Sequence, residues 1–190
     1  SKEAVNPKEG KGVFKNLLLE KKANLSEGEI ETAIVDRFHR INWEVKLPES
    51  LMGRLKLLER HSLINDYSEA VSNGAGNILT EIHKEKQNKL PEWKLLITKL
   101  AGLVHDVGKS GPAQATEEQQ LAIIRMFAVE EPGISDKAVR DLVNEKFENA
   151  ENTLSLLREC GVDVASSMRN FWDMHIAWGH QILEGHKEEL

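Results

Sequence analysis

Nearly every segment after residue 12 carries apolar side chains at helical spacing, and this periodicity constrains the fold more than any other feature. In the segment 29–41, for example, Ile30, Ile34 and Phe38 recur on one helical face. No segment alternates apolar and polar residues over the length of a strand, and the sequence has no internal repeat. The sequence therefore predicts an all-α fold, a bundle of helices around a buried core.

Cap and breaker residues predict where these helices begin and end. Two capping boxes open helices, and they pair Ser26 with Glu29 and Thr116 with Gln119. Prolines or serines mark the starts of three more helices, at Pro48, at Pro91 and at Ser166 or Ser167.

Two predicted helices are unusually long. The first covers 49–71, is weakened or bent by the small residues at 72–76, and continues through 77–86. The second begins at Ser135 or Asp136 and runs to Cys160, where Gly161 stops it at the C′ position.

Composition restricts the class of protein. Hydrophobic residues make up 40% of the 190 residues and charged residues 29%, which is typical of a globular chain. The formal net charge of −6 argues against a nucleic-acid duplex as a partner. No apolar run approaches the roughly 18 residues that a membrane span needs, and the N-terminus lacks the apolar core of a signal peptide. We therefore expect a cytoplasmic protein with no membrane partner.

The single cysteine, Cys160, excludes an intrachain disulfide and a cysteine zinc cluster. We expect it to be a half-buried residue near the end of a helix.

The segment 100–109 carries the most informative chemistry. A strongly apolar helix runs directly into an imidazole and a carboxylate, His105 and Asp106, which are followed by Gly108 and Lys109. Burying such a pair is costly unless both groups are compensated, and a divalent cation compensates both. Gly108 lets the backbone turn near the site. Lys109 lies four residues after His105, so its ammonium group reaches the same side if the helix persists, and it can hold a phosphate there.

The segment LAGLVHDVGK resembles the signature of the HD superfamily of metal-dependent phosphohydrolases. That family carries an upstream histidine on a helix, and His61 stands 44 residues before His105 in a helical context. Many members add a downstream histidine followed four residues later by glycine and then by Ile-Leu, and His175 and Gly179 fit that form. The resemblance covers roughly residues 50–186 and is closest to the HD-GYP-like, multi-histidine members.

This resemblance implies a domain organisation. Residues 46–190 would form the HD-type helical bundle, preceded by a flexible segment, 1–12, and a helical extension, 13–45. The long separation between Asp106 and His175 implies a helical insertion over 110–165. The family's closing His-His segment, Gly-Tyr-Pro motif and distal aspartate are not found after Leu183, so we expect the C-terminal part of the domain to be missing.

The resemblance also implies an activity, the hydrolysis of a small-molecule phosphoester or nucleotide. One or two divalent metal ions, of iron, manganese, magnesium, nickel or zinc, would be held by His61, His105, Asp106 and His175. Asp106 would bridge two ions, and Asp106 and Lys109 would be the catalytic residues.

Other interpretations stay open. The chain can be an inactive HD-type module for signalling or ligand binding, or a di-iron oxygenase of the same superfamily. Residue by residue, His105-Asp106 can be a hydrogen-bonded pair at a helix end, His61 an interfacial histidine, His175 a core residue and Lys109 a solvated lysine. The remaining histidines, His39, His83, His180 and His186, are expected outside the metal site, and the sequence leaves the oligomeric state open.

Overall fold

The computed structural model describes residues 22, 24–64, 66–129 and 134–190. Regular structure in this part of the chain is helical and contains no strand, apart from one isolated antiparallel bridge between Ala138 and Ser167. The predicted all-α class is confirmed. The segment predicted to be flexible, 1–12, and the first part of the predicted extension, 13–21, lie outside the described residues.

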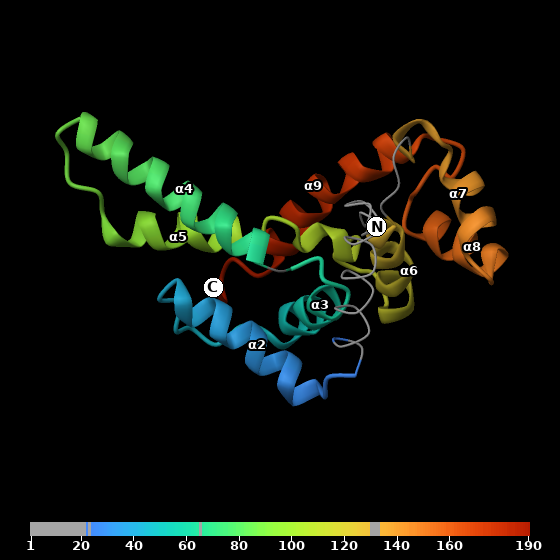
Figure 1. Ribbon diagram of the computed structural model, residues 1–190, viewed down its shortest axis with the longest axis horizontal. Coiled ribbons are helices and arrows are strands. Elements are labelled where there is room, and N and C mark those ends of the chain that lie inside the picture. The colour runs from blue at the N-terminus through green and yellow to red at the C-terminus, as the bar shows by residue number, and fades with distance from the viewer. Residues whose placement is uncertain (1–21, 23, 65, 130–133) are drawn as a thin grey trace, which may run out of the picture.

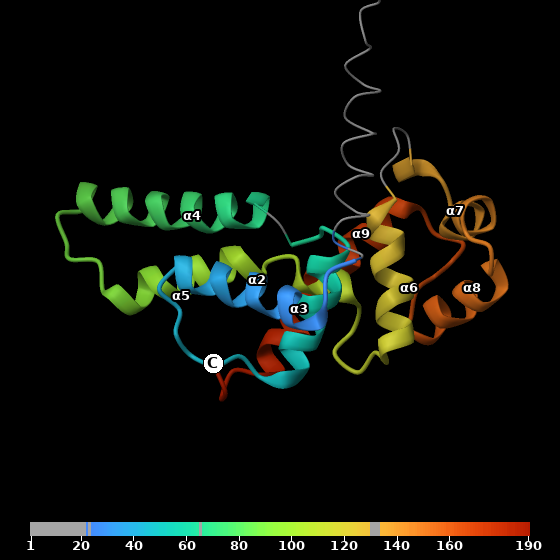
Figure 2. The ribbon, with the colours of Figure 1, turned by 60° about the horizontal axis from the view of Figure 1, so that its bottom comes forward.

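The elements follow one another along the chain in two groups. The first group comprises α2 (Glu27–Arg40), α3 (Glu49–Arg60), α4 (Asp66–Glu85), α5 (Glu92–Val104) and the 3₁₀ turn η1 (Val107–Ser110). The second comprises α6 (Glu117–Ala128), the short turn η2 (Ile134–Asp136), α7 (Val139–Lys146), α8 (Ala150–Glu159) and α9 (Met168–Gly185). The α4–α5 hairpin projects from one side of the molecule, and α7 and α8 lie at the opposite end (Figure 1). Figure 2 shows α4 and α5 side by side and antiparallel.

Five predicted helix starts are confirmed by their caps, whereas the start predicted at Ser135 or Asp136 is wrong, because α7 begins at Val139. Both capping boxes are formed, at Ser26 before α2 and at Thr116 before α6. Pro48, Pro91 and Ser167 are the N-caps of α3, α5 and α9. Gly161 follows α8 with a φ of 81°, the left-handed conformation expected of a C′ glycine.

The prediction of one helix over 49–71 with a weak point at 72–76 is wrong. Helix α3 ends at Arg60, and Ser62 has a φ of 59°, which a helix cannot include. Helix α4 instead runs without interruption through 72–76. The small residues there allow close packing, because a Cβ atom on Gly102 of α5 would lie 2.6 Å from the Cα of Ser72. The Ser72 hydroxyl also donates a hydrogen bond of 2.6 Å to the Lys99 carbonyl.

The prediction of one long helix over 136–160 is also wrong. The segment forms two helices, α7 and α8, and Phe147 at the end of α7 is in an extended conformation. The break lets both short helices bury leucines in the same cluster, Leu142 from α7 and Leu154 from α8. Packing against this cluster outweighs the local preference for a continuous helix.

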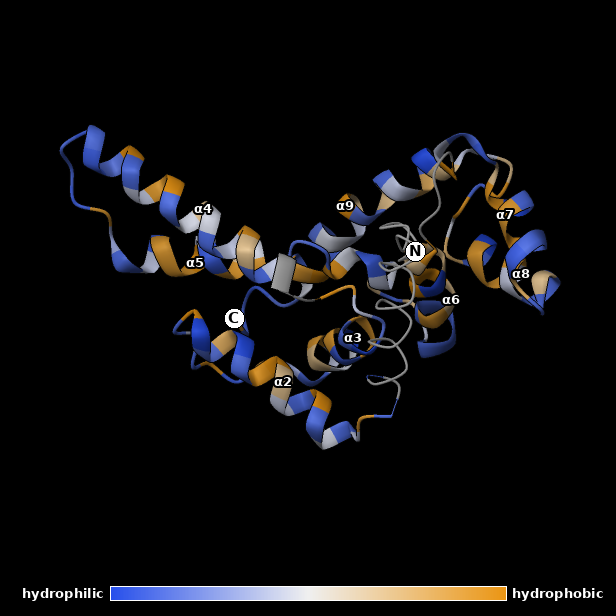
Figure 3. Cartoon of the chain, viewed as in Figure 1, coloured by the Kyte–Doolittle hydropathy of each residue, from blue (hydrophilic) through white to orange (hydrophobic). Residues whose placement is uncertain are grey.

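The described residues form two hydrophobic clusters. The first lies among α2, α3, α5 and η1 and includes Ile34, Leu55 and Leu103. The second lies among α6, α7, α8 and α9 and includes Phe127 and Phe171. Helices α6 and α9 contribute to both clusters. Figure 3 shows the apolar and polar residues alternating along these helices, as expected of amphipathic helices.

None of the helices in the described ranges combines the length and the apolar character that crossing a membrane requires.

Candidate metal centre

The carboxylate of Asp106 lies where α5 gives way to the turn η1. Its side chain is only 8% exposed, and its Oδ2 accepts a hydrogen bond of 2.8 Å from Lys109 Nζ. Helix α5 ends at Val104, so the helix that would carry Lys109 past His105 does not persist. The 3₁₀ turn brings Lys109 to the carboxylate instead, because side chains three residues apart eclipse each other in that geometry.

Two imidazole rings flank this carboxylate. His105 Nε2 lies 3.3 Å from Asp106 Oδ2, and His175 Nε2 lies 3.8 Å from Asp106 Oδ1. His175 is on α9, so the structure brings together residues from two distant segments. Four of the five residues predicted for the site, His105, Asp106, Lys109 and His175, therefore lie around one carboxylate.

Gly108 makes the approach of α9 possible. A Cβ atom at this position would lie 1.8 Å from the carbonyl oxygen of His175 and 2.5 Å from the backbone nitrogen of Gly179. Only glycine allows the turn η1 to pack directly on the backbone of the helix. Gly108 therefore serves close packing, and the left-handed backbone conformation near the site belongs to Gly111, with a φ of 87°.

Hydrogen bonds to the backbone fix the orientation of the predicted histidine ligands. Nδ1 of His105 contacts the Gly102 carbonyl at 2.7 Å, and Nδ1 of His175 contacts the Trp172 carbonyl. Because a carbonyl only accepts, Nδ1 carries the proton, and the lone pair of the neutral ring is on Nε2. Metal-binding histidines commonly donate their second ring nitrogen in this way.

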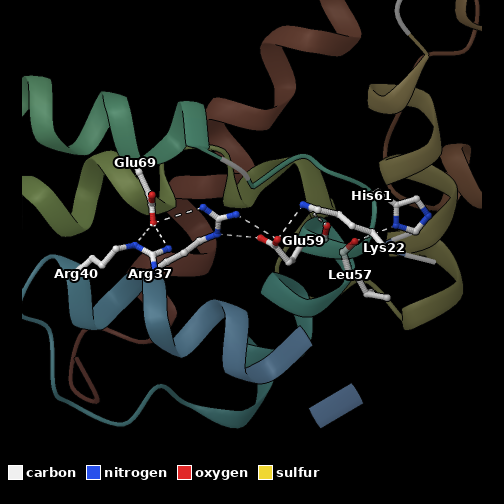
Figure 4. A network of polar contacts seen from close by, with 7 residues as sticks. All are labelled: Lys22, Arg37, Arg40, Leu57, Glu59, His61 and Glu69. Carbon is white, nitrogen blue, oxygen red and sulfur yellow. Dashed lines mark hydrogen bonds and ion pairs between the residues drawn. The ribbon is translucent and has the colours of Figure 1, made fainter. Parts of the chain in front are cut away.

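His61 shows the same backbone hydrogen bond at the end of α3. It caps the C-terminus of α3, and its Nδ1 contacts the Leu57 carbonyl at 2.9 Å (Figure 4). Within the described part of the chain, no hydrogen bond or ion pair joins His61 to Asp106.

The Nε2 atoms of His105 and His175 face the carboxylate that Lys109 already contacts at 2.8 Å. With both rings neutral, these nitrogens would be acceptors turned toward another acceptor, and a proton or a cation between them would relieve the repulsion. Two imidazole nitrogens and a carboxylate are a donor set that divalent transition metals accept, so the residues fit such an ion in their chemistry. Among the described residues, no three histidine, cysteine, aspartate or glutamate side chains are yet arranged as a metal site. Lys109 lies on the carboxylate itself, and His175 Nε2 lies 3.8 Å from it.

Aromatic side chains of α6 and α9 pack against His175 and Lys109 of the candidate centre. They were not assigned to the site from the sequence. The Phe127 ring of α6 lies edge-on to the rings of Trp172 and His175, with centroid distances of 5.6 and 5.8 Å. Lys109 Nζ lies 5.6 Å from the centre of the Trp172 ring, so the ammonium is held between a carboxylate and an indole face. The available signal was the spacing of Trp172, three residues before His175 on the same helical face.

Next to His61, α3 takes part in a buried ion-pair network. The Glu59 carboxylate, 4% exposed, accepts hydrogen bonds from Lys22 at 2.9 Å and from Arg37 at 3.2 Å. Arg37 also lies 3.4 Å from Glu69, which binds Arg40 (Figure 4). The network connects α2, α3 and α4 and fixes the end of α3 that carries His61.

A cavity of about 1030 Å³ opens between α2 and α3, away from the carboxylate cluster. Its wall includes Phe38, Trp43, Arg54 and Ala113 but not His105, Asp106, Lys109 or His175. The candidate metal centre is therefore defined by the positions of its donor atoms and not by this cavity.

No protein-family model, curated protein or solved structure matches this chain. The resemblance to the HD superfamily thus stays a prediction that rests on the motif residues.

Proposed function

We propose that the chain is a metal-dependent phosphohydrolase with its centre at His105, Asp106 and His175. The observation that carries this proposal is the position of two Nε2 atoms, 3.3 and 3.8 Å from the two different oxygens of one buried carboxylate. The substrate would be a small phosphoester, including a nucleotide.

The residues of the centre divide the work. His105 and His175 would supply nitrogen ligands, with their tautomers set by the backbone carbonyls, and Asp106 would supply oxygen. A divalent cation held there would polarise a phosphoryl oxygen and lower the pKa of water. Lys109 would leave the carboxylate and hold a phosphate oxygen as a point charge. The Trp172 ring keeps that ammonium at the site.

The direct test measures the metal content of the purified chain and its hydrolysis of bis(p-nitrophenyl) phosphate with added Mn²⁺. We expect about one or two equivalents of metal in the parent chain. Asp106→Ala should lose both metal and activity, while His180→Gln, an exposed position on the same helix as His175, should keep both. Equal metal content in the Asp106→Ala variant, or none in the parent chain after reconstitution, would overturn the proposal.

One observation favours a second candidate, an inactive helical module that binds ligands without turnover. Lys109 already neutralises Asp106 at 2.8 Å, so the carboxylate has an internal cation. Binding of a nucleotide without hydrolysis, and without any dependence on metal, would identify this case. A mixed-valence iron signal would instead identify the oxygenase alternative.

A further inference from the structure

Arg54 on α3 is a buried cation whose partners are backbone carbonyls. The residue is only 5% exposed, and no carboxylate pairs with it in the described part of the chain. Its hydrogen bonds within the described residues all lie in the segment 110–113, at the end of the turn η1 and directly after it. Nη1 donates to Ser110 Oγ at 2.9 Å and to the carbonyls of Ser110 and Gly111 at 3.2 and 3.3 Å, and Nη2 donates to the carbonyls of Pro112 and Ala113 at 2.8 and 2.7 Å.

Burial of a guanidinium group is costly, so these contacts must compensate it. Burial lowers the pKa of Arg54, but arginine still stays protonated in proteins. The carbonyl oxygens of Gly111 and Pro112 belong to buried residues and need donors in their turn. The planar fork of arginine satisfies several diverging carbonyls at once, which an ammonium group does less well.

The contacts continue from this segment into the candidate centre. The Ser110 hydroxyl, which accepts from Arg54, donates to the Val107 carbonyl at 2.7 Å. Val107 is the first residue of η1, and Asp106 is its N-cap. In the same turn, the Lys109 amide donates to the Asp106 carbonyl at 2.9 Å. The hydrogen bonds of Arg54 therefore lead from α3 into the turn η1, which has Asp106 as its N-cap and Lys109 within it.

We propose that Arg54 is a positioning residue, which clamps the segment 110–113 and thereby holds Asp106 and Lys109 toward His175. Its link to metal binding rests on the proposed function, but its geometry does not. Without the hydrogen bonds of Arg54, the turn η1 would lose its fixed position between α3 and α9.

The experiment compares Arg54→Met and Arg54→Lys with Arg60→Met. Arg60 is a matched control, because it lies on the same helix and donates to Leu25 and Glu27 near the start of α2. Hydrogen exchange of the Lys109, Gly111 and Ala115 amides reports the clamp. Mn²⁺ affinity, followed by the electron paramagnetic resonance of the free ion, reports the centre. The ¹⁵N signals of His175, assigned with His175→Gln, report its surroundings without any metal.

In Arg54→Met we expect faster exchange at those amides, shifted His175 signals and a loss of about 10- to 100-fold in Mn²⁺ affinity, all measured while the variant is folded. Arg54→Lys should recover part of each effect, and Arg60→Met should change none of them. A purely structural role for Arg54 would lower the melting temperature and leave the Mn²⁺ affinity and the His175 signals of the folded variant unchanged, which would overturn the proposal.

Failure of the proposed function would look different. If the parent chain binds no Mn²⁺, the proposed metal centre fails, and the amide exchange and the His175 signals decide the role of Arg54. Unchanged exchange and signals in Arg54→Met would then overturn it. If Arg54→Met does not fold, the same comparison is made with Arg54→Lys.

Discussion

A Cβ atom on Gly108 would lie 1.8 Å from the carbonyl oxygen of His175, so the turn η1 and the helix α9 meet backbone to backbone. This contact places His175 beside Asp106 although the two residues are far apart in the sequence. The geometry of the centre therefore depends on the absence of a Cβ atom at Gly108.

Gly108→Ala should accordingly be strongly destabilising. The added methyl group meets backbone that cannot move without separating η1 from α9, so we expect a loss of about 3 kcal/mol or more in the free energy of unfolding. Urea denaturation measures this. The control is Gly53→Ala, since a Cβ there meets nothing within 4 Å and should stabilise α3 by about 0.5–1 kcal/mol. Equal stability of the two variants would contradict the observed packing.

Lys109→Met should change metal binding and turnover in opposite directions. The ammonium occupies Asp106 Oδ2 at 2.8 Å and competes with any other cation for that oxygen. We therefore expect a severalfold increase in Mn²⁺ affinity together with a loss of phosphodiester hydrolysis. Titration calorimetry and a rate assay check the two halves. Lys187→Met, which removes an exposed lysine, should affect neither.

His175→Gln should weaken Mn²⁺ binding more than His61→Gln. Both rings present the same tautomer, but only His175 has its Nε2 near the central carboxylate, at 3.8 Å. Parallel titrations of the two variants compare the effects directly. A larger loss from His61→Gln would show that α3 supplies a principal ligand after all.

Glu59→Gln should destabilise the helices α2, α3 and α4 together. The buried carboxylate compensates Lys22 and Arg37, and its neutralisation leaves Glu69 as a carboxylate partner of Arg37. The expected loss is about 1–3 kcal/mol in the free energy of unfolding. Glu145→Gln, which removes an exposed partner of Lys137, should change the stability little.

Cys160 should react slowly with iodoacetamide. Burial, and then the charge of Glu159, raise the pKa of its thiol, so the folded chain holds less of the reactive thiolate at any given pH. The midpoint of the rate–pH profile should lie above that of the urea-unfolded chain. Coincident profiles would show that the thiol is not shielded.

The capped starts of the helices could be predicted from the sequence better than the continuity of the helices. Caps act over three residues, so Ser26 and Thr116 carry their own information. The breaks after Arg60 and at Phe147 depend on which cluster the next helix must cover, and that is a property of the folded chain. The small residues at 72–76 misled for the same reason, because their partner is α5.

The candidate site shows the same limit. Asp106 and Lys109 are close in sequence, and a motif suggested His175. Arg54 and Phe127 belong to no motif and reach the centre only through tertiary packing. From the sequence, an arginine on an amphipathic helix is expected to be exposed to solvent. The position of Arg54 is known only from its hydrogen bonds to the carbonyls of 110–113.

Ile123 and Ile124 are neighbours on α6, yet they enter different hydrophobic clusters, and Trp178 and Ile182 divide α9 in the same way. The segment 110–165 therefore cannot be deleted and replaced with a linker without disrupting both clusters. Its removal would take apolar side chains from both clusters and would remove the Phe127 ring that lies edge-on to His175. The candidate centre lies where the turn η1, from the first group of elements, contacts the helix α9, from the second.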